Sequence, residues 1–273
     1  MATTLPTPWR PTRSARLTWG GILGLFCLLA LLAPWLWHGD PLLQLGDGLN
    51  AMGMPLPPSW AHPFGTDDLG RDLLARWLYG ARVSLGVGFA ATILAGFLGG
   101  IVGILAGFFR GWVDLVLMRL TEIVMAFPTL LLAIALAAVL PPSIWMVILT
   151  LGLVGWTAIA RIVRAAALKV REQEFIAAAE ALGASPFDIL FRHVLPNVAP
   201  TLGSLLTLKL ADMFLLEAAL SFLGLGVRPP TPSWGNMIQE GELYFRDAPW
   251  IILAPGLAIV FVVLAANMLQ ERA

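Results

Sequence analysis

The sequence predicts an all-α integral membrane protein with about six transmembrane helices. Hydrophobic residues make up 58% of the 273 residues and charged residues 12%, whereas soluble domains are roughly one-quarter charged. Apolar stretches of about 20 residues, the length that crosses about 30 Å of hydrocarbon, recur along the chain. Short segments rich in Pro, Gly and charged residues separate them. Water is therefore not the main solvent of this chain.

The predicted spans follow the longest charge-poor apolar runs. The first is free of charge and follows three arginines, as a secretory signal would, but its apolar run exceeds the roughly 7–15 residues of a signal core. We therefore interpret it as a retained span. Pro141 and Pro142 separate the third span from the fourth by a tight turn. The predicted boundaries are residues 17–37, 83–109, 115–140, 143–160, 198–225 and 250–268.

The distribution of Lys and Arg predicts the orientation in the membrane. Eleven of them lie on the side that carries the N-terminus and five on the opposite side. Because short cytoplasmic loops carry an excess of these residues, we expect both termini in the cytoplasm. This divides the chain into a cytoplasmic segment, residues 1–16, and a transmembrane domain, residues 17–273. It also places residues 161–197 in the cytoplasm and the two largest outer loops, 38–82 and 226–249, outside.

Glycines in the second predicted span indicate close helix packing. Gly96, Gly99, Gly100, Gly103 and Gly107 include three pairs at small-x-x-x-small spacing. This spacing lets two helix backbones approach closely in lipid. We favour packing inside the subunit over a dimerisation face.

The cytoplasmic segment 171–197 predicts two short helices joined at a corner. Phe175, Ala178, Ala179 and Leu182 recur at helical spacing and form a small apolar stripe. Gly183 is a helix stop. Ser185, Pro186 and Asp188 then form a helix start, with a capping hydroxyl, Pro at the first position and an acid in the first turn. Such a corner suits docking in a groove of another protein, although an ordinary surface loop has the same pattern.

Three ionisable residues lie in the fifth predicted span: Lys209, Asp212 and Glu217. Lys209 and Asp212 are three residues apart and can pair on one helix face. Glu217 has no charged residue at pairing distance in the sequence, so we expect it to meet another helix, a partner subunit or water in a pathway. Charges inside a membrane are expensive and mark pathways, so pathway lining and proton relay are alternatives to structural pairing.

The cytoplasmic segment resembles the signature loop of ABC importer permeases, whose pattern is Glu-Ala-Ala, three residues, Gly and a later Leu-Pro. Ala178, Ala179, Gly183, Leu195 and Pro196 match it, while Ala177 stands where Glu is usual, and Glu180 where Arg is frequent. Residues 64–72 with 80–85, and 217–227 with 232–235, are similar to two further motifs of the dipeptide, oligopeptide and nickel permease family. Within that family the chain resembles the "C"-type subunit.

The resemblance implies a permease subunit of an ATP-driven, binding-protein-dependent importer in a bacterial inner membrane. Its expected partners are a second permease, two cytoplasmic ATPases that carry ATP and Mg, an extracytoplasmic binding protein and membrane lipid. The expected solute is a di- or oligopeptide, with nickel or a metal chelate as the alternative. The residues expected to couple this chain to the ATPases are Glu174, Ala178, Ala179, Glu180, Gly183, Ser185, Asp188, Leu195 and Pro196.

The residues themselves give no sign of catalysis. A phosphate-binding loop is missing, and Lys169 and Lys209 are the only lysines that could serve one. Cys27 is the single cysteine and the three histidines are dispersed, so we predict no catalytic residue, no metal site and no cofactor on this chain. Acidic and basic residues balance at 17 each, so nucleic acid is not an expected partner. An ion-coupled secondary transporter and a non-transporting scaffold remain as alternative classes.

Overall fold

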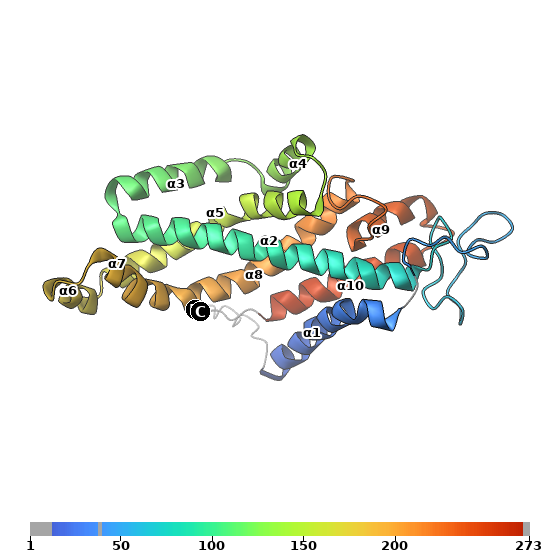
Figure 1. The fold of residues 1–273 in the computed structure, drawn as a ribbon, viewed down its shortest axis with the longest axis horizontal. Coiled ribbons are helices and arrows are strands. Elements are labelled where there is room, and N and C mark those ends of the chain that lie inside the picture. The colour runs from blue at the N-terminus through green and yellow to red at the C-terminus, as the bar shows by residue number, and fades with distance from the viewer. Residues whose placement is uncertain (1–12, 38–39, 270–273) are drawn as a thin grey trace, which may run out of the picture.

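The computed structural model describes residues 13–37 and 40–269, which form a helical bundle with no regular strand among them (Figure 1). Most of the predicted N-terminal segment, residues 1–12, lies outside the described residues. The elements are α1 (Arg13–Leu36), α2 (Leu73–Phe109), α3 (Gly111–Met125), α4 (Thr129–Val139), α5 (Ile144–Arg171), α6 (Glu174–Ala181), α7 (Pro186–Ile189), the π-helix η1 (Leu190–Val194), α8 (Leu195–Phe222), α9 (Trp234–Gly241), the 3₁₀-helix η2 (Glu242–Tyr244) and α10 (Trp250–Met268).

The all-α membrane architecture is confirmed, and the span count remains approximate. By length and composition, four described helices can cross a membrane: α1 from Leu17 on, α2, α5 and α10. The bent pair α3 and α4 makes a fifth if it is counted as one span. The predicted fifth span corresponds to α8, which has 28 residues and lies in the bundle but carries the three ionisable residues.

The third predicted span, 115–140, is wrong as a continuous helix. The structure breaks it after Met125, and α3 and α4 meet at an angle of 88°. Pro128 explains the break, because a proline lacks an N–H group and disfavours the helical conformation of the residue before it, here Phe127. The sequence analysis treated residues 115–140 as one apolar run and did not consider the effect of this proline.

Two other predicted spans are longer in the structure. α2 begins ten residues before position 83, where the Asp72 carboxylate caps the helix by accepting a bond from the Ala75 N–H. With 37 residues it is about 55 Å long, more than the hydrocarbon layer requires. α5 continues to Arg171 rather than ending at 160, so the predicted loop 161–197 is helical over its first part. α8 begins at Leu195 and ends at Phe222, slightly earlier than the predicted 198–225.

The glycines of α2 pack inside the subunit, as predicted. A Cβ atom on Gly99 would lie 2.6 Å from the Trp156 carbonyl oxygen in α5, and one on Gly103 would lie 2.5 Å from the Ala160 carbonyl oxygen. Gly96 and Gly100 face Leu206 and Leu202 of α8 in the same way. The bundle core therefore forms where α2 contacts α5 on one side and α8 on the other.

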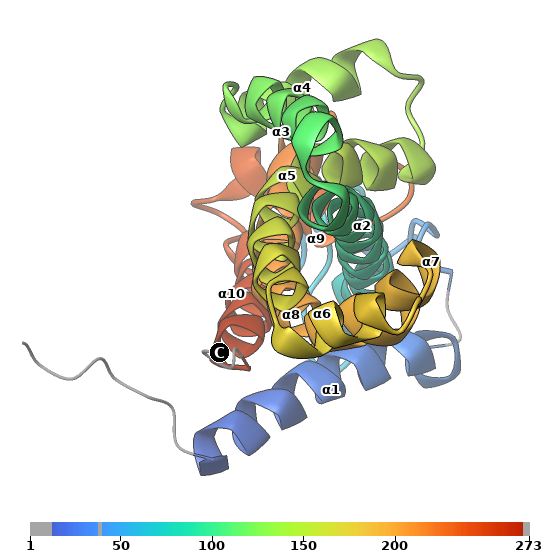
Figure 2. The same cartoon turned by 90° about the vertical axis from the view of Figure 1, so that its left-hand side faces the viewer.

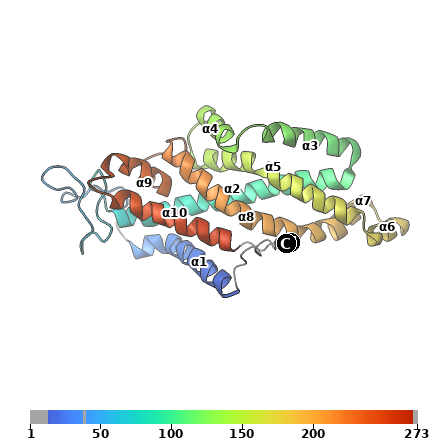
Figure 3. The ribbon, with the colours of Figure 1, turned by 180° about the vertical axis from the view of Figure 1, so that it is seen from behind.

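The two ends of the bundle carry different elements. α6 and α7 lie at one end, beyond the ends of α1 and α10, and Figure 2 views the bundle from that end. The long segment before α2 and the short helix α9 lie together at the opposite end, as Figure 3 shows from behind. Sequence-predicted cytoplasmic and outer loops thus separate to opposite ends of the bundle.

Candidate functional site

The predicted helical corner is present at the end of the bundle that carries α6 and α7. Gly183 has a φ of +84°, a left-handed conformation that favours glycine, and it ends the turn after α6. Ser185 caps α7: its hydroxyl accepts a bond from the Asp188 N–H, and Pro186 occupies the first turn. The π-helix η1 then leads directly into α8, whose first residues are Leu195 and Pro196. The corner is therefore continuous with a membrane helix.

Most of the predicted stripe on this corner is exposed, Phe175 included. Ile176 is fully buried, and Ala179 is half-buried and packs against the core of its own subunit. Ala178 is exposed. Leu182 is 88% exposed, and Phe187 and Phe191 are also exposed, so the corner presents three large apolar side chains.

Charged residues also lie on this corner. Glu180 pairs with Arg171 at the end of α5, and Arg171 lies over the ring of Phe108 at 5.5 Å. Glu174 is exposed in the first turn of α6. Asp188 lies 3.5 Å from Arg192, one helical turn on. The corner thus presents both large apolar and charged side chains.

The Lys209 and Asp212 side chains pair in α8 as predicted, at 2.8 Å. They line a groove of about 400 Å³ formed by α5, α8 and the break between α3 and α4. The other lining residues are uncharged and mostly apolar: Val124, Met125, Phe127, Thr129, Leu132, Val154, Gly155, Thr157, Ala158, Met213, Leu215 and Leu216. The pair is therefore the charged element of the groove wall.

Glu217 occupies a different environment from the pair. Its side chain is 1% exposed and accepts a 2.8 Å hydrogen bond from the Ser221 hydroxyl in the next turn of α8. The Ser84 hydroxyl of α2 also hydrogen-bonds to it, which confirms contact with another helix. The expectation that Glu217 has no local partner is wrong, since the sequence search considered charged partners only. Glu217 is absent from the groove lining.

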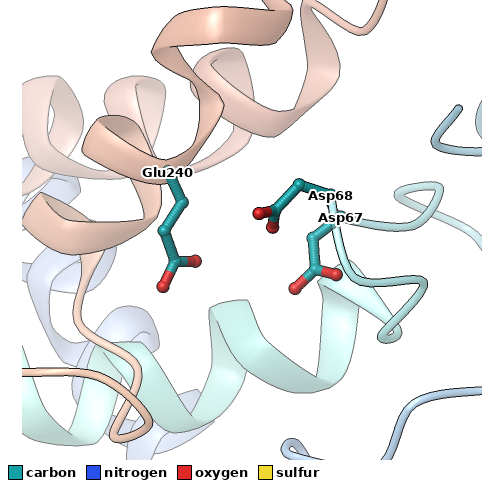
Figure 4. Close-up of side chains that lie close together, drawn as sticks. All are labelled: Asp67, Asp68 and Glu240. Carbon is teal, nitrogen blue, oxygen red and sulfur yellow. The ribbon is translucent and has the colours of Figure 1, made fainter.

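A cluster of five charged side chains, at the end of the bundle opposite α6 and α7, was missed as a site. Arg76, in the first turn of α2, is fully buried and lies 2.7 Å from Asp67 and 2.7 Å from Glu240 of α9. Arg71 lies 2.6 Å from Asp67 and 3.4 Å from Glu240. Figure 4 shows Asp67, Asp68 and Glu240 converging from the loop and from α9. Asp67, Asp68 and Arg71 belong to the motif 64–72, which the sequence analysis used only as a resemblance, whereas Arg76 and Glu240 lie outside it.

The three carboxylates of this cluster lie close enough to hold a cation, since one oxygen of each lies within 4.8 Å of the others. The two guanidinium groups already neutralise most of their charge, so the cluster is an ion-pair network and not a site for a divalent cation. Burial raises the pKa of Glu240 to about 7, and Arg71 opposes that shift. Burial also raises the pKa of Asp68.

Comparison with known proteins identifies the family. Residues 99–272 match the family described as binding-protein-dependent transport system inner membrane component, which is well over half of the chain. The chain belongs to this family. It is 44% identical over 253 residues to a peptide transport system permease protein of Brucella suis, covering 92% of this chain and 82% of that protein. It is 38% identical over 274 residues to the dipeptide transport system permease protein DppC of Alkalihalophilus pseudofirmus, covering 98% and 88%.

The fold is also similar to a solved structure of the MetNI methionine ABC transporter in an inward-facing conformation. The TM-score is 0.58 at 20% identity, over 71% of this chain and 91% of that one. The ABC permease fold therefore applies to the described bundle. As a permease subunit of this family, the chain is a non-catalytic membrane component, and the family implies no cofactor on it.

Proposed function

We propose that this chain is the transmembrane permease subunit of an ATP-driven importer of di- and oligopeptides in a bacterial inner membrane. The observation that carries the proposal is the similarity to peptide and dipeptide permease proteins over 92–98% of the chain at 38–44% identity. The same relatives favour peptides over nickel or a metal chelate. In this role the chain works with a second permease, two ATPase subunits that bind ATP and Mg, and an extracytoplasmic binding protein.

The corner formed by α6 and α7 is proposed to dock on an ATPase subunit in the cytoplasm. Its support is the exposure of three large apolar side chains, those of Leu182, Phe187 and Phe191, which a solvent-exposed loop would not need. Protein interfaces combine apolar residues with charged and polar ones, and the corner carries both. With the α6–α7 corner on the cytoplasmic side, both termini lie in the cytoplasm, and the cluster of Arg76 and Glu240 lies outside.

The charged residues of α8 give less support to the rival class, an ion-coupled secondary transporter. Lys209 and Asp212 neutralise each other at 2.8 Å, and the Glu217 carboxylate is held by hydroxyl groups. No chain of titratable side chains connects these three residues along the described part of α8, as a proton relay would require.

Uptake in intact cells separates the two classes. A strain that lacks this chain, with and without a plasmid copy, is given a radiolabelled dipeptide. We expect uptake to require the plasmid, to stop when cellular ATP is depleted, and to continue when an uncoupler collapses the proton gradient while ATP is maintained. Uptake that follows the proton gradient and not ATP would reverse the assignment.

A further inference from the structure

The groove that contains Lys209 and Asp212 has the dimensions of a small-molecule site. Its volume of about 400 Å³ lies within the range of about 300–1,000 Å³ that ligand pockets occupy. Its walls come from three places in the chain: α5, α8, and the α3–α4 break at Phe127. It therefore lies where the chain departs from regular helix packing.

The charged pair lies in the central part of α8. Lys209 is near the middle of α8, which runs from Leu195 to Phe222. Its side chain is 22% exposed and that of Asp212 is 53% exposed in the isolated subunit. In a membrane-embedded helix, charges at such a central position face a water-filled path or another protein surface and not lipid, because exposure of a charge to hydrocarbon is too costly.

The pair does not hold the fold together. Both residues belong to α8, so their 2.8 Å contact joins no two elements. The pair between Asp114 and Arg164 is different, because it links α3 to α5. A structural reason for two charges at the centre of α8 is therefore missing, whereas Glu217 has one in its bonds to Ser221 and Ser84.

The groove carries one cation and one anion among uncharged walls, and this charge pattern complements a zwitterion. Side chains three residues apart on a helix have Cβ atoms about 5–6 Å apart. The two ends of a two-residue backbone are at most about 7 Å apart. The ammonium and carboxylate ends of a short peptide can therefore meet Asp212 and Lys209 at the same time, while apolar walls such as Val154 and Met213 accept varied side chains.

We propose that Lys209 and Asp212 are the groove residues that contact a short zwitterionic peptide during its passage. The Lys209 ammonium binds the peptide carboxylate, the Asp212 carboxylate binds the peptide ammonium, and the two residues neutralise each other when no solute is present. The proposal rests on the proposed function as a peptide permease and assigns specificity to two residues of this chain.

The first test is ATP-dependent uptake of radiolabelled alanyl-alanine by the complete transporter with its binding protein in lipid vesicles. The variants are Lys209→Met, Asp212→Asn, and the double change Lys209→Met with Asp212→Leu. Each is expected to lower uptake by about tenfold, with the double variant no better than the single ones. The matched control is Arg119→Met with Glu122→Leu, an exposed pair of the same spacing on α3 outside the groove lining, and it is expected to leave uptake unchanged.

A second readout measures contact directly and does not depend on the binding protein. The purified complex is cross-linked with a photoreactive dipeptide whose carboxyl end is free or amidated. Lys209→Met should lower the cross-linking yield of the free peptide by about tenfold and leave that of the amidated peptide unchanged. Asp212→Asn should show the same pattern for a free against an acetylated amino end.

Each failure has a separate meaning. Restoration of uptake by the double variant would show that the two residues only neutralise each other and would overturn the proposal. Loss of the second permease from the purified variants would overturn it as well, since the pair would then be an interface between subunits. Normal uptake by all variants would reject the solute contact alone. Failure of the unaltered transporter to take up the dipeptide with ATP would reject the proposed function itself.

Discussion

The guanidinium group of Arg76 in α2 lies 2.7 Å from the carboxylate of Glu240 in α9, 164 residues further along the chain. Arg76 also binds Asp67, so one buried side chain joins the loop before α2 to the helix before α10. The Trp250 indole adds a bond to the Thr66 carbonyl oxygen in the same region. These contacts assemble the end of the subunit opposite α6 and α7 from segments that are distant in sequence.

Arg76→Met is expected to destabilise the protein by about 3 kcal/mol, because it leaves buried carboxylates short of a positive partner. The measurement is thermal unfolding of the purified transporter in detergent, followed by tryptophan fluorescence. Arg82→Met is the matched control, since Arg82 is exposed on the same helix, and its expected effect is below about 0.5 kcal/mol. If the two variants lose the same stability, the structural role assigned to the cluster is wrong.

Glu217→Gln is expected to keep near-normal uptake and stability, because the amide oxygen still accepts the bonds of Ser221 and Ser84. Glu217→Leu leaves these hydroxyls without an acceptor and is expected to cost about 2 kcal/mol of stability. Uptake and thermal unfolding are measured on both variants. Loss of uptake by Glu217→Gln with unchanged unfolding would show instead that the charge acts in transport.

The contrast between Glu217 and the Lys209–Asp212 pair shows what sequence could and could not predict. The pair follows from spacing on one helix, and the structure confirms it. The Glu217 environment depends on Ser84, which lies 133 positions earlier in the sequence and reaches it only through the packing of α2 against α8. Long-range contacts of this kind leave no periodic signal in the sequence.

Elsewhere in the chain, too, local features were predictable from the sequence and long-range contacts were not. The cap at Ser185 and the stop at Gly183 are local, and both were predicted correctly. The glycines of α2 also gave a correct prediction, because close packing in lipid needs small residues. The bend at Pro128 was predictable from local chemistry but was overlooked within a long apolar run. The burial of Arg76 was not predictable, because its partner Glu240 belongs to α9, which is distant in sequence.

Leu182→Asp is expected to reduce co-purification of the ATPase subunits by about tenfold, because it places a charge in the proposed apolar contact. Leu243→Asp is the control: Leu243 is 90% exposed in η2 at the opposite end and should leave co-purification unchanged. Insertion into the membrane is checked for both variants. Normal ATPase retention by Leu182→Asp would place the docking surface elsewhere.

Cysteine labelling checks the orientation. In a background with Cys27→Ser, Ser59→Cys should react in intact cells with a membrane-impermeant thiol reagent, and Ala177→Cys should react only after the cells are opened. Both positions are exposed at opposite ends of the bundle. Ser233, a predicted outer residue, is fully buried as the cap of α9 and is unsuitable. Labelling of Ala177→Cys in intact cells would invert the orientation.

The most direct test of the ATP-driven import proposal is reconstitution with defined sides. Lipid vesicles contain this chain, the second permease and the ATPase subunits. The binding protein with labelled dipeptide is added on the side that carries the cluster of Arg76 and Glu240. We expect the dipeptide to cross only when ATP is present on the side of α6 and α7 and only when the ATPase subunits are included. Passage driven by an imposed proton gradient, without ATP or ATPase subunits, would contradict the proposed function.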